Sequence, residues 1–249
     1  MMIEVDNLTH TFRARGDRTT SPLQDVSCTF EDGTINYLLG LNGTGKSTLL
    51  GCIAGIHRPT HGSVLIDGRA LSELRYPLRS VGSHLSSNKF QKTHSALTHL
   101  RWLCKLANAP EERAAELLNA VELNSVGNTP IANYSLGMRQ RLGIASVLVG
   151  NPRNIILDEP LNGLDIQGVM WLRSLIQGWA DEGRCVLIAS HHLKEVEATA
   201  GTVTVLSQGN IVASGTTTEV IQQNQATDLE QAIAQLIPEL GPCTFSRIH

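Results

Sequence analysis

Short apolar runs alternate with helix-like segments along most of this chain. The strand-like runs in its first third, each bounded by turn residues, are residues 2–5, 26–30, 35–39 and 64–66. Further along, two continuously apolar runs, residues 155–157 and 186–189, flank a stretch with helical spacing of apolar residues across 169–179. A helix between two apolar strands is typical of a parallel sheet buried on both faces. The pattern therefore predicts an α/β fold.

Helical spacing dominates the middle of the chain. Behind a possible capping hydroxyl at Ser95, the apolar residues of a first predicted helix are Leu97, Leu100, Leu103 and Leu106. Pro110, followed by two glutamates, indicates the first turn of another helix. We expect the leucine stripe and Trp102 to form the core of this region rather than a contact surface.

Composition and charge limit the classes of partner. The 20 basic and 23 acidic residues give a formal charge of −3, which does not favour nucleic acid as the main partner. No apolar run approaches the ~18 residues of a membrane-spanning helix. The N-terminal residues also lack the basic and apolar regions of a signal peptide. Five cysteines without a Cys-x-x-Cys pair favour reduced thiols. We therefore expect a cytoplasmic protein.

A phosphate-binding motif follows the strand-like run at residues 35–39. The sequence from residue 40 to residue 48 matches G-x-x-x-x-G-K-[S/T] and opens the helical run at 48–54. The glycines let the backbone amides curl around an anion, and the helix N-terminus adds positive charge at the same point. The nucleotide-binding residues predicted in this way are Gly40, Leu41, Asn42, Gly43, Thr44, Gly45, Lys46, Ser47 and Thr48. Among them, Lys46 would contact the β- and γ-phosphates, and the Ser47 hydroxyl would bind Mg²⁺.

Two adjacent carboxylates indicate what happens to the nucleotide. Asp158 and Glu159 end the apolar run at 155–157. Successive residues of an extended chain point in different directions, so the two acids can serve different roles. Asp158 would hold Mg²⁺, and Glu159 would orient or deprotonate an attacking water. Because a kinase needs no base reserved for water, this pair favours hydrolysis of ATP.

A further motif lies between the two loops. The sequence Ser-Leu-Gly-Met-Arg-Gln-Arg-Leu at residues 135–142 resembles the Leu-Ser-Gly-Gly-Gln signature of the ATP-binding subunits of ABC transporters. Asp165 resembles the D-loop aspartate of that family, and His191 resembles its switch histidine. Phe12 stands where the family places an aromatic ring on adenine, and residues 209–215 resemble the closing turn of its nucleotide-binding domain. The resemblance covers roughly residues 2–220.

The resemblance implies a fold and a division into domains. We expect a P-loop NTPase with an ABC ATPase core, a mostly parallel sheet, an N-terminal antiparallel β subdomain and a helical subdomain. The nucleotide-binding domain would span residues 1–220, with the helical subdomain at 87–148. In the family this subdomain docks on the membrane subunit. A tail at 221–249 would carry one helix, formed around Leu229, Ile233 and Leu236.

The resemblance also implies roles for single residues. In the family, the signature serine and the glycine that follows, here Ser135 and Gly137, reach the γ-phosphate bound on a partner subunit. His191 would contact the same phosphate and sense its loss, whereas His192 would face away. For Phe12, stacking on adenine and a place in the core of the N-terminal sheet remain equal alternatives.

Two departures from the family pattern stand out. Leu136 and Met138 replace the Gly and Gln of the consensus signature, in a style that resembles exporter-type and antibiotic-resistance or bacteriocin-immunity ATPases. The glutamine of the family's Q-loop is replaced by Ser86. Because serine is shorter, contact with the metal there would be water-mediated or lost.

These motifs together predict an ATPase subunit that binds ATP and Mg²⁺. It would dimerise with an identical or paralogous ATP-binding subunit and drive export of a small molecule or peptide through a separate membrane permease. It would lie on the inner face of the cell membrane and would not act on nucleic acid. One alternative is a soluble ABC-type ATPase that acts on nucleic acid or ribosomes, although such proteins usually carry two nucleotide domains or long coiled coils. The other is a P-loop kinase, in which the signature, Asp165 and His191 would have no task.

Overall fold

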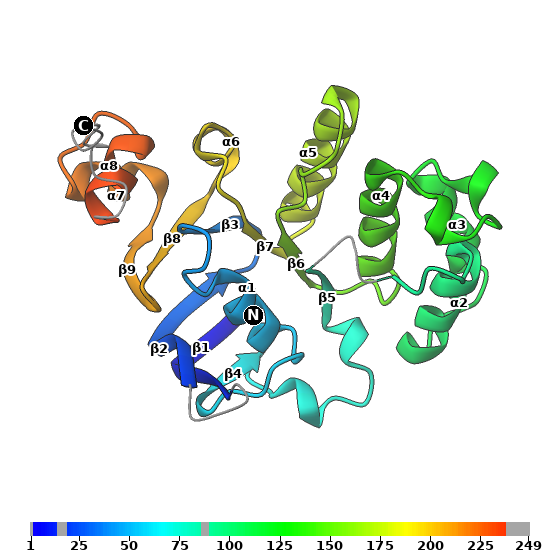
Figure 1. Cartoon of the computed structure of the whole chain (residues 1–249), viewed down its shortest axis with the longest axis horizontal. Helices are drawn as coiled ribbons and strands as arrows, with labels where there is room; N and C mark the ends of the chain where they lie inside the picture. Colours follow the sequence, from blue (N-terminus) through cyan, green and yellow to red (C-terminus); the bar gives the residue numbers. More distant parts are fainter. Residues whose placement is uncertain (1, 14–18, 86–89, 238–249) are drawn as a thin grey trace, which may run out of the picture.

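Two β-sheets of different kinds form the framework of the computed structural model, which describes residues 2–13, 19–85 and 90–237 (Figure 1). Within these ranges, a 3-stranded antiparallel sheet has the order β2–β1–β4, formed by β1 (Met2–Arg13), β2 (Thr19–Glu31) and β4 (His61–Ile66). The second sheet of the described chain has 6 strands in the order β5–β6–β7–β3–β8–β9. Its strands are β3 (Thr34–Leu39), β5 (Val81–His84), β6 (Asn154–Asp158), β7 (Cys185–Ala189), β8 (Thr202–Ser207) and β9 (Asn210–Gly215). All of its pairings are parallel except that of β8 with β9.

The parallel sheet is buried on both faces, as the apolar runs predict. In β3, Tyr37 and Leu39 join one core cluster, whereas Leu38, between them, joins the other. Helix α1 (Lys46–Ile53) lies between the two sheets and contacts β1 and β6. Helix α5 (Ile166–Asp181) contacts β3 and β7 on the opposite face. The predicted α/β fold with an antiparallel N-terminal sheet is therefore confirmed.

Three helices build a separate hydrophobic cluster beside β5. They are α2 (Ala96–Ala107), α3 (Arg113–Ala120) and α4 (Leu136–Val147), gathered at one end of the molecule in Figure 1. Ser95 caps α2 as predicted, because its hydroxyl accepts a hydrogen bond of 3.2 Å from the amide of Thr98. Helix α3 begins at Arg113 rather than at Pro110, since residues 111–112 form a turn.

The expectation that the whole leucine stripe and Trp102 form a core is wrong. Leu100 is fully buried, but Trp102 and Leu106 are each 61 % exposed. The reason is the period of the helix. Steps of three residues turn by only about 300°, so a stripe with that spacing drifts around the axis and leaves the buried face. The face that is buried instead carries Ala96, Leu100, Cys104 and Ala107.

The C-terminal part of the described chain packs against the parallel sheet. Helix α6 (Leu193–Thr199) follows β7, and α7 (Thr217–Gln223) and α8 (Leu229–Leu236) follow β9. The helix expected around Leu229 and Ile233 is present, and both residues are buried in the cluster that covers the sheet. Helix α7 was not expected, although Thr216 and Glu219 form a capping box at its start. In the described ranges, every helix is too short or too polar to cross a membrane.

Candidate functional site

The loop between β3 and α1 has a backbone path that requires glycine at two points. Gly40 has φ +154°, and a Cβ atom there would lie 2.3 Å from the carbonyl oxygen of Leu206. Gly45 has φ +109°, and a Cβ atom there would lie 2.5 Å from the carbonyl oxygen of Pro22. Neither position accepts a side chain without movement of a neighbouring backbone. The loop therefore takes a form in which its amides can face an anion.

Lys46 is held within this loop. Its ammonium donates hydrogen bonds to the carbonyl oxygens of Gly40 and Leu41, at 2.7 and 3.0 Å. The residue is only 7 % exposed, and this burial lowers the pKa of the Lys46 ammonium, while Glu159 and Asp158 act in the opposite direction. A phosphate bound by the loop would be a strong acceptor for this buried cation.

The two predicted metal ligands are in direct contact. The Ser47 hydroxyl at the start of α1 donates a hydrogen bond of 2.7 Å to Oδ2 of Asp158 at the end of β6. Burial raises the pKa of Asp158, the Ser47 hydrogen bond opposes that rise, and the Glu159 carboxylate adds to it. A hydroxyl and a carboxylate are hard oxygen donors, and Mg²⁺ is usually held by one or two such groups together with substrate phosphates. The two residues therefore fit Mg²⁺.

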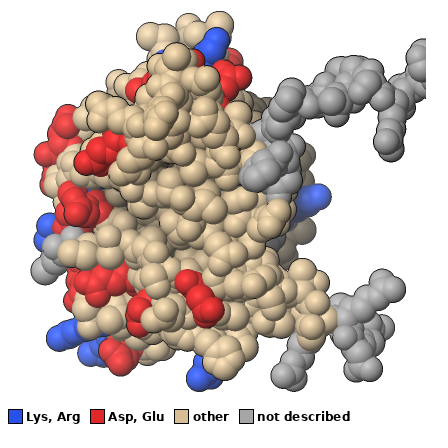
Figure 2. Space-filling model, turned by 90° about the vertical axis from the view of Figure 1, so that its left-hand side faces the viewer, with Lys and Arg blue, Asp and Glu red and all other residues tan. Residues whose placement is uncertain are grey.

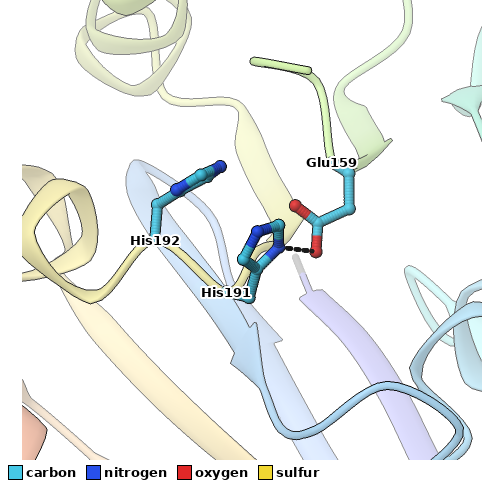
Figure 3. A group of neighbouring side chains, drawn as sticks. All are labelled: Glu159, His191 and His192. Atoms are coloured by element: carbon cyan, nitrogen blue, oxygen red, sulfur yellow. Dashed lines mark hydrogen bonds and ion pairs between the residues drawn. The ribbon is translucent and has the colours of Figure 1, made fainter.

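Glu159 and Asp158 have different hydrogen-bond partners, as expected for different roles, but the cause differs from the expected one. The backbone of Glu159 is not extended. It has φ +50°, a conformation that is uncommon for a residue with a side chain. A hydrogen bond of 2.9 Å from its amide to the carbonyl oxygen of Ala189 holds it there. As a result, Oε1 of Glu159 lies 2.8 Å from Nδ1 of His191, while Oε2 is buried without a hydrogen-bond partner (Figure 3).

Lys46, Ser47, Asp158 and Glu159 border one cavity of about 360 Å³, which His191 does not line. Its walls come from the phosphate loop, the end of β6 and the segment after it. The lining residues are Pro22, Asn42, Gly43, Gly45, Lys46, Ser47, Thr48, Leu85, Gln140, Asp158, Glu159 and Asn162. The phosphate loop and both carboxylates therefore meet at a single site, at the carboxyl ends of β3 and β6.

The predicted signature residues do not line that cavity. Ser135 caps α4, and its hydroxyl accepts a hydrogen bond of 3.2 Å from the amide of Met138. A Cβ atom on Gly137 would lie 3.3 Å from the carbonyl oxygen of Gly163, so the start of α4 lies against the segment after Glu159. Asp165 caps α5, with Oδ1 accepting a hydrogen bond of 2.7 Å from the amide of Gly168. In this chain Ser135 and Gly137 thus form a helix N-terminus outside the phosphate cavity.

Three further predicted positions have different outcomes. Phe12 is 43 % exposed and lines a neighbouring cavity with His57, so it is not a core residue of the N-terminal sheet. His192 lies against His191, with ring centroids 4.1 Å apart, but it lines a different cavity from the phosphate cavity, as a residue that faces away from the phosphates would. Ser86 lies outside the residues that the structure describes.

Sequence reasoning missed a buried polar chain beside the cavity. Nε2 of His84, at the end of β5, lies 2.6 Å from Oε1 of Gln140 on α4. Gln140 in turn donates a hydrogen bond of 2.9 Å to the carbonyl oxygen of Asn162. A Cβ atom on Gly143 would lie 2.3 Å from the His84 ring, so the glycine makes room for the imidazole. The sequence feature that could have indicated this chain is the spacing of Gln140 and Gly143, which lie three positions apart and therefore on one face of the helix.

Comparison with known proteins places these motifs in one family. A family model described as "ABC transporter" matches residues 23–162. The lantibiotic transport ATP-binding protein SrtF of Streptococcus pyogenes is 36 % identical over 211 residues, which cover 85 % of this chain and 89 % of that protein. The bacitracin transport ATP-binding protein BcrA of Enterococcus faecalis is 33 % identical, across 90 % of this chain and 72 % of that protein.

Solved structures agree in fold. One described as the ATP-binding subunit of an ABC transporter superimposes with a TM-score of 0.84 at 25 % identity, covering 95 % of this chain and 99 % of that one. A second, the ATP-binding cassette MJ0796 in a dimeric post-hydrolysis state with ADP and Pi, gives a TM-score of 0.77 at 23 % identity. It covers 86 % of this chain and 98 % of that one.

Proposed function

This chain belongs to the ABC transporter family and is an ATPase subunit of it, and we propose that it powers export of a peptide or other small molecule through a separate membrane permease. The observation that carries the proposal is the meeting of Lys46, Ser47, Asp158 and Glu159 around one cavity. A protein that only binds the nucleotide would need Lys46, Ser47 and Asp158. It would not need a further carboxylate such as Glu159, which contacts His191.

Within the site, each residue has a separate task. The loop amides and Lys46 bind the β- and γ-phosphates, and Ser47 and Asp158 hold Mg²⁺. When bound, the ion neutralises phosphate charge and orients the phosphate oxygens. Glu159 accepts a proton from the attacking water or orients it, since its buried Oε2 has no other hydrogen-bond partner in the described structure. His191 is positioned by Glu159 to contact the γ-phosphate.

The site is completed by a second subunit. Ser135 and Gly137 lie at the N-terminus of α4, where free amides and a hydroxyl can bind an anion, yet they do not line this chain's own cavity. Two chains placed head to tail would bring each signature to the other's γ-phosphate. ATP would then hold the two subunits together, and hydrolysis would release them. The second subunit is an identical chain or a paralogue.

The exposed face of α2 is the proposed contact with the permease. Trp102 and Leu106 are both largely exposed there, and exposed aromatic and apolar groups of this size mark interaction surfaces. Contact with a permease would hold this subunit on the inner face of the cell membrane. Nucleic acid, the partner in the alternative interpretation, is disfavoured by charge: on the face in Figure 2, Asp and Glu are more prominent than Lys and Arg.

The names of the two relatives suggest the substrate class. One is described as a lantibiotic transport ATP-binding protein and the other as a bacitracin transport ATP-binding protein. The Leu136 and Met138 form of the signature fits the same branch. We therefore propose a peptide antibiotic as the exported class.

The experiment is purification of the chain together with the membrane protein encoded beside its gene. We expect a stable complex whose ATP turnover rises several-fold with peptide antibiotics, and a matched complex with Trp102→Ala and Leu106→Ala that assembles poorly. Turnover that responds to ribosomes or nucleic acid, and not to the membrane protein, would contradict the proposal.

A further inference from the structure

Two loops bring two imidazoles together with the carboxylate of Glu159, which lines the cavity (Figure 3). Glu159 follows β6, and His191 and His192 follow β7. One ligand atom from each of the three lies within 4.8 Å of the other two. We propose that Glu159, His191 and His192 form a binding site for a Zn²⁺-class transition-metal ion, and that an ion bound there stops ATP hydrolysis.

The donor set selects the class of ion. Two imidazole nitrogens and one carboxylate oxygen are a known ligand set for Zn²⁺, with water in a fourth position. Ligand atoms at about 2.0–2.1 Å from a tetrahedral Zn²⁺ lie roughly 3.4 Å apart. Nδ1 of His191 and Oε1 of Glu159 are 2.8 Å apart in a hydrogen bond, so this pair must open slightly and the His192 ring must turn toward it when the ion binds. Mg²⁺ prefers oxygen ligands and is not suited to this set.

The backbone of the site is fixed while its imidazoles can turn. The amide of Glu159 is bound to the carbonyl oxygen of Ala189, and the amide of His192 donates to the Ser190 hydroxyl at 3.1 Å. Both imidazoles are exposed, with the His191 side chain 52 % accessible. An ion can therefore enter from solvent and draw two rings toward a carboxylate whose position is set by the strand ends.

A second observation independently points to a cation. Oε2 of Glu159 is buried and has no hydrogen-bond partner in the described structure. A carboxylate oxygen without a donor is costly in a low-dielectric site, and a metal ion satisfies it directly. The His191–Glu159 contact uses only the other oxygen, so the carboxylate retains this capacity.

Inhibition follows from the identity of the ligands and rests on the proposed function. Glu159 is the proposed base for water and His191 the proposed contact to the γ-phosphate, so an ion held by both would keep them from these tasks. Lys46 and the phosphate loop lie outside the three ligands, and ATP binding should persist. His192 has no part in the proposed hydrolysis, which makes it the position at which the metal site can be tested separately.

The experiment measures Zn²⁺ binding directly, on tag-free protein without nucleotide, by competition with a fluorescent chelator. We expect one Zn²⁺ per chain, and at least about tenfold weaker binding in His192→Ala, as for the loss of one ligand. The matched control is His61→Ala, which removes another exposed histidine and should bind as the parent does. Co²⁺ bound at this site should give a tetrahedral absorption spectrum without the charge-transfer band of a cysteine ligand.

Turnover is measured in the same variants, relative to the Zn²⁺-free rate of each. Zn²⁺ should inhibit the parent at about tenfold lower concentration than it inhibits His192→Ala. Equal Zn²⁺ affinity in the parent and His192→Ala would overturn the site. Binding that depends on His192 but leaves turnover unchanged would overturn the inhibition and contradict the roles proposed for Glu159 and His191.

Discussion

The imidazole of His84 and the side-chain amide of Gln140 meet across 2.6 Å in the interior of the protein. His84 is the last residue of β5, directly before the segment that contains Ser86, and Gln140 lies on the signature helix α4. Through its second hydrogen bond, Gln140 also contacts the carbonyl oxygen of Asn162, after Glu159. These bonds connect three segments around the phosphate cavity. We therefore regard His84 and Gln140 as positioning residues.

Replacing His84 by Val should separate positioning from nucleotide binding. The change leaves Oε1 of Gln140 without a partner, which costs about 1–3 kcal/mol of stability. We expect turnover to fall about fivefold, equivalent to roughly 1 kcal/mol, while the Kd for ATP stays within about twofold. Steady-state kinetics and nucleotide titration check both values. Adding Gly143→Ala fills the space of the lost ring, so the double variant should regain the part of the stability that packing contributes but no turnover. If the double variant regained both stability and turnover, His84 would act only by filling space and not by positioning Gln140.

Burial of His84 also predicts a dependence of stability on pH. Desolvation lowers the pKa of His84, opposed by its hydrogen bond to Gln140. The unfolded chain takes up a proton near the ordinary histidine pKa of about 6.5, while the folded chain does so only at lower pH. The free energy of unfolding should therefore decrease as pH falls below about 6.5. Denaturant titrations should show a smaller decrease for His84→Val. Part of the decrease in the free energy of unfolding should remain in this variant, because burial lowers the pKa of His99 as well.

Asp158→Asn should stabilise the nucleotide-free protein while abolishing activity. Burial raises the pKa of Asp158, so the folded state disfavours its charge, and that cost is fully present at neutral pH. An amide of the same shape removes the charge and the repulsion from Glu159. We expect Tm to rise by about 2–4 °C, as for roughly 1 kcal/mol in a chain of this size, and Mg²⁺-dependent hydrolysis to be lost. A lower Tm in calorimetry would refute the desolvation argument.

Lys46→Ala should weaken nucleotide binding itself. The ammonium is buried inside the loop and would make charge-assisted contacts with phosphate. Loss of such contacts should raise the Kd for ATP at least about tenfold, measured by equilibrium titration. Lys105→Ala on the exposed side of α2 is the control and should leave the Kd unchanged. An unaltered Kd in Lys46→Ala would be incompatible with the proposed phosphate loop.

The sequence predicted the parts of this molecule that depend on neighbours along the chain. The loop from Gly40 to Thr48 depends on glycine geometry between a strand and a helix, and the cap at Ser95 is a local hydrogen bond. The buried strands around Leu38 and Ile156 follow from continuous apolar runs. Each of these features is encoded within about ten residues, and each was found.

The features that were missed depend on contacts across the fold. Strand β5 has four residues and ends in Ser83 and His84, so its apolar pattern is too short to predict a strand. The burial of His84 is explained by its contact with Gln140, which lies far away in the sequence. The positive φ of Glu159 is imposed by the neighbouring strand through Ala189. No local pattern contains this information.

The central claim is that two chains close around ATP, each completing the other's site, and solution mass of the Glu159→Gln variant tests it most directly. Because Gln cannot accept the water proton, ATP should remain bound. With ATP and Mg²⁺, light scattering should give twice the protomer mass, and without nucleotide a single protomer. Adding Ser135→Glu, which places a negative charge against the partner's phosphate, should abolish the doubling while ATP still binds. A variant that binds ATP yet keeps the mass of one protomer, or doubles regardless of Ser135, would contradict the account.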